Sequence, residues 1–438
     1  MDTQVAPRGF WPTLKQLGPG LIVSGSIVGS GELIATTTLG ARVGFAALWL
    51  IIVSCLIKVL VQIELGRYSI SSGDTSLRAL DKVPGPRWRA SWVAWAWMFM
   101  FIGVTFQQGG IIGGVGQVFN VAFPQLGVQT WAIISSILAA VLLLRGTYSN
   151  VERISTILVV SFTFITVACA LLLAWTPYAV RSEQLVEGFS FTIPAGGLAV
   201  AFAAFGITGV GATELIYYPY WCLEKGYRRF VGPNDHSAAW VERARSWIRV
   251  MQIDAVLAMF LYTLATVAFY MLGAGVLYAM GTVPSGYEMV STLSSMYTST
   301  LGNWALYLFL VGAFFVLFST TFSATASNSR VVVDFLELIG IIRVQDEDQR
   351  RSWRRVMIIG LLVLFVILYS WVGEPVLMVI IGGIAQACML PIIGFSAIYL
   401  RYRRTERALR PQLWVDLLLW LTSSMMLAFA LYTLWTRL

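Results

Sequence analysis

Residues 28–34 read VGSGELI and residues 210–216 read VGATELI, so the pattern V-G-x-x-E-L-I occurs twice. The copies are 182 residues apart, and each lies inside a long apolar run. Each copy places a helix-breaking glycine and then a carboxylate at a depth in the bilayer where an unpaired charge costs ~3 kcal/mol or more. Because intramembrane acids are usually functional, Glu32 and Glu214 are the first candidates for a functional site.

The composition is that of a polytopic membrane protein. Hydrophobic residues make up 58% of the 438 residues and charged residues 12%, whereas soluble domains have about 25% charged residues. The net charge of +8 comes from basic residues in short loops, so we expect a lipid bilayer and no nucleic acid as partner. Four scattered cysteines and a single histidine predict no disulfide framework, no Cys/His metal centre, no cofactor and no enzyme activity.

Apolar runs long enough to cross about 30 Å of hydrocarbon predict eleven transmembrane helices in an all-α protein. The predicted helices are 18–40, 44–66, 92–120, 129–145, 154–176, 195–222, 250–281, 301–330, 354–372, 374–400 and 413–436. We interpret the whole chain, 1–438, as one transmembrane transport domain. It contains two five-helix repeats at about 18–176 and 195–400, followed by an extra helix.

The distribution of basic residues in the loops predicts the orientation, because cytoplasmic loops collect Lys and Arg. With the N-terminus in the cytoplasm, 26 of the 30 basic residues lie on the cytoplasmic side. Only Arg42, Arg181 and Arg437 lie outside, and Lys58 lies within the second helix. The C-terminus is therefore expected outside, and the asymmetry supports a count of eleven.

With this topology the first and sixth helices cross the membrane in opposite directions, which predicts an inverted repeat. Folds of this kind bind substrate near the midplane between interrupted helices. We expect Glu32 and Glu214 each to begin a second half-helix, where the positive end of the helix dipole favours a carboxylate. The glycines expected to interrupt the two helices are Gly25, Gly29, Gly31, Gly206, Gly209 and Gly211.

Other polar residues at membrane depth allow two interpretations each. Gln107 and Gln108, in the glycine-rich third helix, either line a cavity or form interhelical hydrogen bonds. The same two alternatives hold for Gln386 in the tenth helix, which we count as a candidate binding residue. Ser323 belongs to a Ser/Thr run that either lines a wet inward path or bonds to its own helix.

Lys58 is the remaining charge within a predicted helix. It either snorkels toward the membrane surface or pairs with Glu64 or Glu32. The sequence alone does not choose between these alternatives.

Three stretches resemble the Nramp family of divalent-metal transporters. Residues 18–41 (GPGLIVSGSIVGSGELIATTTLGA) are similar to the family's first helix, and residues 65–75 (LGRYSISSGDT) to the end of its second. The Ser/Thr run of the eighth helix, followed by 331–338, also resembles the family. This resemblance, which spans most of the chain, implies a LeuT-type fold and a bacterial inner membrane.

The departures from the family pattern lie at the expected site. The family has Asp-Pro-Gly-Asn where this chain has GSGE at 29–32, and Met-Pro-His where this chain has Ala212, Thr213 and Glu214. The resemblance implies that backbone carbonyls of Ser26 and Gly209 complete the site. Glutamines and glycines of the third helix stand where the family has acidic residues for proton movement, so the resemblance does not extend to proton coupling.

These observations lead to three functional hypotheses. The first is secondary-active transport of a divalent cation such as Mn, Mg or Ca, with Glu32 and Glu214 as ligands and carbonyls near Gly29 and Gly211 as further donors. Where the family has a methionine thioether, this chain has Ala212, so the remaining candidate ligands are oxygen atoms. Oxygen ligands suit these ions. The second is transport of an organic solute, an amine or amino acid, with glutamates that bind ammonium or carry protons. The third is a non-transporting membrane sensor. Oligomeric state is open, with a monomer plausible.

Overall fold

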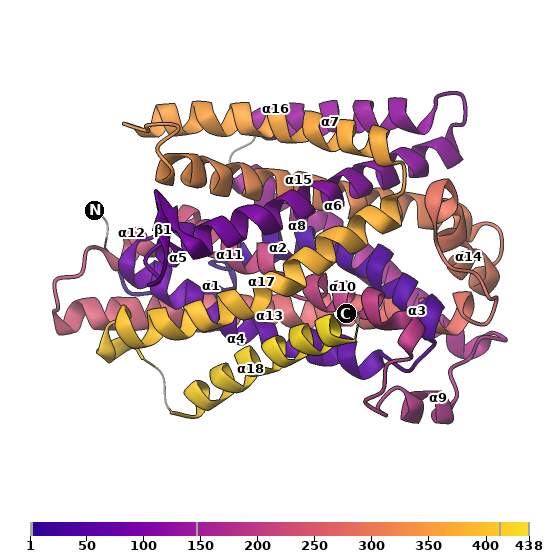
Figure 1. Ribbon diagram of the computed structural model, residues 1–438, viewed down its shortest axis with the longest axis horizontal. Coiled ribbons are helices and arrows are strands. Elements are labelled where there is room, and N and C mark those ends of the chain that lie inside the picture. The colour runs from indigo at the N-terminus through magenta and orange to yellow at the C-terminus, as the bar shows by residue number, and fades with distance from the viewer. Residues whose placement is uncertain (1–2, 146–147, 411–412, 437–438) are drawn as a thin grey trace.

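Long apolar helices dominate the computed structural model, which describes residues 3–145, 148–410 and 413–436. They run roughly along one axis and form a bundle (Figure 1). The first half contains α1 (Phe10–Leu14), α2 (Pro19–Ile27), the π-helix η1 (Val28–Thr36), α3 (Thr37–Val43), α4 (Leu48–Ser72), α5 (Ser76–Leu80), β1 (Arg87–Trp88), β2 (Ala90–Ser91), α6 (Trp92–Ala122), α7 (Val128–Arg145), α8 (Tyr148–Leu172), the 3₁₀ turn η2 (Leu173–Trp175) and α9 (Ser182–Glu187).

The second half begins with the 3₁₀ turn η3 (Ala195–Gly197) and continues to the C-terminal helix. Its elements are α10 (Leu198–Ile207), α11 (Ala212–Lys225), α12 (Tyr227–Val231), α13 (Ala238–Leu272), the π-helix η4 (Gly273–Leu277), the 3₁₀ turn η5 (Gly286–Glu288), α14 (Met289–Leu301), α15 (Ala305–Leu338), α16 (Glu347–Val372), α17 (Pro375–Arg403), the 3₁₀ turn η6 (Arg407–Leu409) and α18 (Leu413–Trp435).

Ten helices in the described part of the chain are long and apolar enough to span a membrane. The predicted fifth helix corresponds to the 25-residue α8 and the turn η2 that follows it, where a shorter apolar segment spans residues 163–175. The count of eleven therefore stays a prediction. Helices α13 and α16 begin at Ala238 and Glu347, before the predicted starts at 250 and 354, because their first turns are polar and continue the helix beyond the apolar run.

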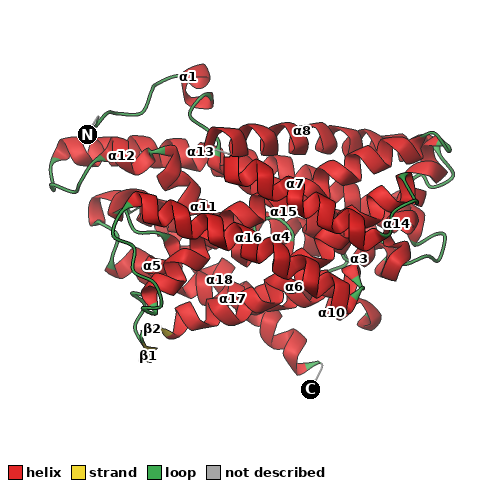
Figure 2. Cartoon of the chain, turned by 90° about the horizontal axis from the view of Figure 1, so that it is seen from above, coloured by secondary structure: helices red, strands yellow, loops and turns green. Residues whose placement is uncertain are grey.

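The two ends of the bundle carry different connections. Helices α5 and α12 and the two-residue β1–β2 ribbon lie at one end, and α9 and α14 at the other (Figures 1 and 2). The first end holds the basic loops, and there Asp74 accepts hydrogen bonds from Lys82 (2.5 Å) and Tyr68 (2.7 Å). Arg437, expected on the opposite side, lies outside the described residues.

The first membrane helix remains wound throughout, unlike the predicted broken helix. Helix α2 passes directly into nine residues of π-helix, η1, and then into α3. The expectation that Glu32 begins a half-helix is therefore wrong, because Glu32 lies in the middle of η1. The hydroxyls of Thr36 and Thr37 donate to the carbonyls of Glu32 and Leu33, which gives these widened turns additional partners. Such π-helical segments occur frequently at functional sites.

The sixth membrane helix is interrupted as predicted. Helix α10 ends at Ile207, α11 begins at Ala212, and residues 208–211 are not helical. Gly209 has φ of +61°, a backbone conformation that side chains with a Cβ rarely adopt. Glu214 lies in the first turn of α11. Two copies of one sequence pattern therefore have different backbone structures.

Glycines of the first helix allow close packing. A Cβ on Gly31 would lie 2.9 Å from the carbonyl oxygen of Ile207, and one on Gly29 would lie 1.8 Å from Oγ1 of Thr320. The segment η1 thus packs against the end of α10 on one side and against α15 on the other. This packing brings Glu32 to the interruption in the sixth helix.

Candidate functional site

Glu214 accepts two hydrogen bonds at one carboxylate oxygen. Its Oε1 accepts hydrogen bonds from the hydroxyls of Ser26 (2.8 Å) and Tyr217 (2.7 Å), and these two hydroxyls also contact each other. The side chain is buried, at the positive end of the α11 dipole. A Cβ on Gly211 would lie 2.5 Å from the second oxygen, Oε2, so this glycine leaves the space that the carboxylate occupies.

Glu32 is fully buried and has fewer partners. Its Oε1 accepts from Oγ1 of Thr266 at 2.8 Å, but that hydroxyl lies 2.6 Å from the carbonyl of Tyr262 and has one proton for both acceptors. The backbone amide of Gly209 lies near the carboxylate, and Glu214 is close enough to interact with it electrostatically. The oxygen Oε2 has no hydrogen-bond partner among the described residues. Glu32 thus retains capacity to bind a cation or a proton.

Lys58 points toward the interruption of the sixth helix rather than toward the membrane surface. Its ammonium donates to the carbonyls of Phe205 (2.7 Å) and Thr208, and it lies 5.2 Å from the centre of the Phe205 ring. It is near enough to both site glutamates to interact electrostatically. The predicted alternative of pairing with Glu64 is wrong, because Glu64 lies 3.0 Å from each of two arginines, Arg67 and Arg401.

Gln386 reaches the site through an interhelical chain of hydrogen bonds. Its Oε1 accepts from the backbone amide (3.0 Å) and the hydroxyl (2.5 Å) of Thr213, and its Nε2 donates to Oε1 of Gln107 (2.8 Å). It therefore satisfies an amide in the first turn of α11, next to buried Ala212. Within the described chain, Oε1 of the neighbouring Gln108 is buried without a partner.

The Ser/Thr run of α15 bonds mainly to its own helix. Oγ of Ser327 donates to the carbonyl of Ser323 (2.7 Å), and Oγ1 of Thr325 to the carbonyl of Thr321 (2.6 Å). Both Ser319 and Thr320 also lie 3.2 Å from the carbonyl oxygen of Gly25 in α2. The run is buried, and its hydroxyls hold the first helix against α15 in this conformation.

Sequence reasoning missed Asp254, a buried carboxylate in α13. It accepts from the backbone amides of Gly18 (2.8 Å) and Gly20 (2.6 Å) and from the hydroxyl of Tyr218 (3.1 Å). It therefore ties the start of the first helix to α13 and α11. The sequence does carry a signal for Asp254, because this carboxylate lies inside the apolar run 250–281. Like Glu32, it is an acidic residue within a predicted membrane helix. Tyr217 and Thr266 carry no comparable signal.

A second missed carboxylate, Asp334, closes the end of the bundle that carries α5. It is 1% exposed and accepts from Thr75 (2.6 Å), Tyr220 (2.8 Å) and Arg350 (2.7 Å). These contacts join α11, α15, α16 and the residue before α5. Asp334 lies beyond the predicted end of the eighth helix at 330. It therefore did not stand out as an acidic residue inside a predicted membrane helix.

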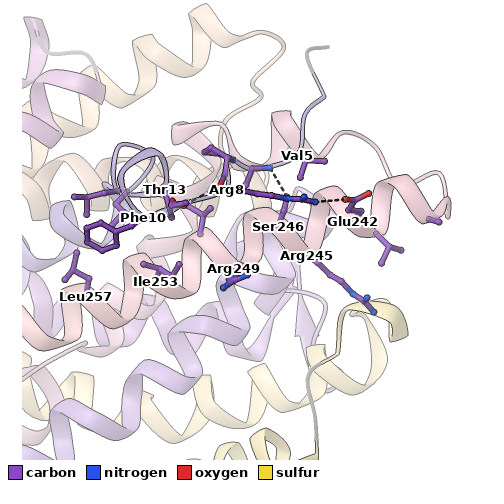
Figure 3. Close-up of a pocket in the computed structure, with 18 residues that line it drawn as sticks. Val5, Arg8, Phe10, Thr13, Glu242, Arg245, Ser246, Arg249, Ile253 and Leu257 are labelled. Carbon is purple, nitrogen blue, oxygen red and sulfur yellow. Dashed lines mark hydrogen bonds and ion pairs between the residues drawn. The ribbon is translucent and has the colours of Figure 1, made fainter.

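The site is sealed, and a large cavity lies elsewhere. Glu32 and Glu214 are 0% and 7% exposed. A cavity of about 1060 Å³ opens between the N-terminal segment and α13, lined by Arg8, Phe10 and Leu257 among others, and holds no predicted site residue (Figure 3). Among residues 3–145, 148–410 and 413–436, no cluster of three or more His, Cys, Asp or Glu is placed to hold a metal. A bound cation would therefore need hydroxyl, amide or carbonyl oxygens in addition to carboxylates.

Comparison with known proteins relates the chain to one family and one fold. The sequence pattern of the family described as natural resistance-associated macrophage protein-like (Nramp) matches residues 20–436. An uncharacterized protein of Pasteurella multocida is 24% identical over 458 residues, which cover 99% of this chain and 96% of the relative.

Solved structures show the same architecture. A manganese transporter of Eremococcus coleocola, in complex with an aromatic bis-isothiourea substituted compound, superposes with a TM-score of 0.71 at 15% identity, over 99% of this chain and 89% of the other. MhsT in complex with L-phenylalanine superposes with a TM-score of 0.62 at 17% identity, over 100% of both chains. These likenesses show that the fold is of the LeuT type.

Proposed function

The chain belongs to the Nramp family, and on this premise we propose that it is a secondary-active transporter of divalent metal cations. The observation that carries the proposal is the carboxylate of Glu32, which is buried within electrostatic range of Glu214 and keeps one oxygen without a hydrogen-bond partner among the described residues. A buried carboxylate with so few hydrogen bonds favours a bound cation. We expect the substrate to bind beside the interrupted helix, at a depth where an unpaired charge is costly.

The donors around the two glutamates favour a hard cation. Carboxylates are joined there by the hydroxyl oxygens of Ser26 and Thr213 and the side-chain oxygen of Gln386. Oxygen ligands of this kind suit Mg, Ca or Mn, and position 212 carries an alanine in place of a thioether, although the buried thiol of Cys55 also lies close to Glu32. We propose that Glu32 and Glu214 bind the ion directly.

Closure on the α5 side supports transport by alternating access. The contacts of Asp334 with Tyr220 and Arg350 join α11 to α15 and α16, and opening toward that side would have to break them. Asp254 ties α2 to α11 near the same end, so the first and sixth helices would move together.

The test is flux of Mn, Mg and Ca into proteoliposomes, with and without a pH gradient. The double variant Glu32→Gln, Glu214→Gln should lose uptake, whereas Glu183→Gln, an exposed residue of α9, should keep it. The effect of the pH gradient on the wild type would show whether protons are coupled. Flux that is equal in the double variant and the wild type would exclude a role for the two glutamates.

A second candidate is transport of an organic monocation, and the position of Lys58 favours it. Two carboxylates and one nearby ammonium give the site a net charge of −1 rather than −2, if all three groups are ionised. A labelled amine should then accumulate in vesicles, and divalent cations should not compete with it. If no solute moves under any gradient, both transport proposals fail and a sensor remains.

A further inference from the structure

The interruption of the sixth helix creates a group of oxygen acceptors that a lysine fills. The last carbonyls of a helix lack partners within it, and they carry the negative end of the helix dipole. At the end of α10 the carbonyls of Phe205 and Thr208 are such groups, and both accept from the ammonium of Lys58. The lysine comes from a different helix, α4.

Two hydroxyls complete the surroundings of these carbonyls. Oγ of Ser54 lies 2.9 Å from Oγ1 of Thr208, 3.4 Å from the carbonyl of the same residue and 3.3 Å from the carbonyl of Phe205. Two carbonyl and two hydroxyl oxygens thus lie together at the negative end of a helix. Oxygens in this arrangement bind cations where discontinuous membrane helices end.

The charged and titratable groups near the ammonium come from four elements. Cys55 of α4, Glu32 of η1 and Glu214 of α11 interact with it electrostatically. Tyr262 of α13 lies close to Cys55 and Glu32. In the described chain no ion pair within 4 Å is formed by Lys58, so its hydrogen bonds are those with the carbonyls of Phe205 and Thr208.

We propose that Lys58 is a tethered cation, whose ammonium occupies a site that would otherwise bind a free monovalent ion such as Na⁺ or K⁺. The ligands of that latent site are the carbonyls of Phe205 and Thr208 and the hydroxyls of Ser54 and Thr208. The wild-type chain consequently needs no monovalent metal ion to stabilise the interrupted helix. This inference concerns the helix end rather than the transported substrate, so it holds for either proposed function.

The test is the unfolding temperature of the purified full-length chain in NaCl, KCl or choline chloride at equal ionic strength, without substrate. The wild type should unfold at the same temperature in all three salts. Lys58→Ser removes the ammonium and leaves space, so Na⁺ or K⁺ should raise its unfolding temperature by a few degrees over choline, in a saturable manner. Lys58→Arg keeps a cation and should show no such dependence. Lys15→Ser, the same change at an exposed position, should behave as the wild type.

Each remaining outcome is decisive. A Lys58→Ser chain that folds only in NaCl or KCl would support the proposal. A chain that folds but responds equally to all three salts would overturn it, since Lys58 would then be only a helix cap. Failure to fold in every salt would also overturn it, because a free ion would not replace the ammonium. A wild type stabilised by Na⁺ would show that the lysine does not fill the site. None of these results depends on metal flux.

Discussion

Replacing Glu32 and Glu214 singly with glutamine should have different consequences for the stability of the substrate-free protein. Glutamine keeps the shape of glutamate but removes the charge. Glu32 has one shared hydroxyl as side-chain partner, whereas Glu214 has two hydroxyls and the end of a helix dipole. A hydrogen bond to a charged group contributes about 1 kcal/mol more than a neutral one, and a helix terminus about 1 kcal/mol. We expect Glu214→Gln to be about 2 kcal/mol less stable than Glu32→Gln.

The Glu32→Gln variant should unfold no more readily than the wild type, because the loss of one weak bond is offset by removal of a poorly solvated charge. Both variants should nevertheless bind a divalent cation at least about tenfold more weakly, a change of 1.4 kcal/mol. The assay is unfolding followed by tryptophan fluorescence in detergent, with and without Mn. A Glu32→Gln chain that is less stable than Glu214→Gln would refute the reasoning, since Glu32 would then be the better compensated carboxylate.

Three further predictions concern other parts of the structure. Gly209→Ala should lower stability by about 2 kcal/mol or more, measured by chemical unfolding, because φ is positive there and the new Cβ would lie 2.8 Å from the Cα of Cys55. Asp334→Asn breaks the ion pair between Asp334 and Arg350, so the end of the bundle that carries α5 should open more often. Maleimide should then label the buried thiol of Cys222 at least about tenfold faster than in the wild type, with Cys222→Ser as the background control. An unchanged labelling rate would argue against closure at this end. Although partial burial opposes the charge, hydrogen bonds led by that of Lys82 hold the pKa of Asp74 below its ordinary value. The resulting stability is present above a pH of about 4 and is lost as the pH falls through the lowered pKa, so Asp74→Asn should flatten acid unfolding in this range.

The course of the two motif-bearing helices shows which features the sequence could predict. Hydropathy and loop charge predict the bundle and place Glu32 and Glu214 at membrane depth, because both depend on local composition. The same local pattern nevertheless forms a π-helix in one copy and an interruption in the other. The difference lies in distant partners, which a single sequence does not reveal.

Those partners satisfy the backbone groups of the two helices in different ways. Around the first helix, hydroxyls of Ser319 and Thr320 meet the carbonyl of Gly25, and the chain stays wound. At the sixth helix, Lys58 and Gln386 take up the groups that the interruption exposes. Residues from other helices therefore decide whether a glycine-rich segment unwinds.

The widened turns of η1 give the first helix a torsional freedom that an ordinary α-helix lacks. A π-helix bonds residue i to i+5, so each wide turn holds more residues than an α-helical one. If a wide turn narrows, all residues beyond it rotate about the helix axis while the backbone remains hydrogen bonded. Because Glu32 lies in the middle of this segment, the direction of its carboxylate depends on how many wide turns precede it. The first helix can turn its carboxylate by a change of winding, whereas the sixth is interrupted at residues 208–211 and can bend there.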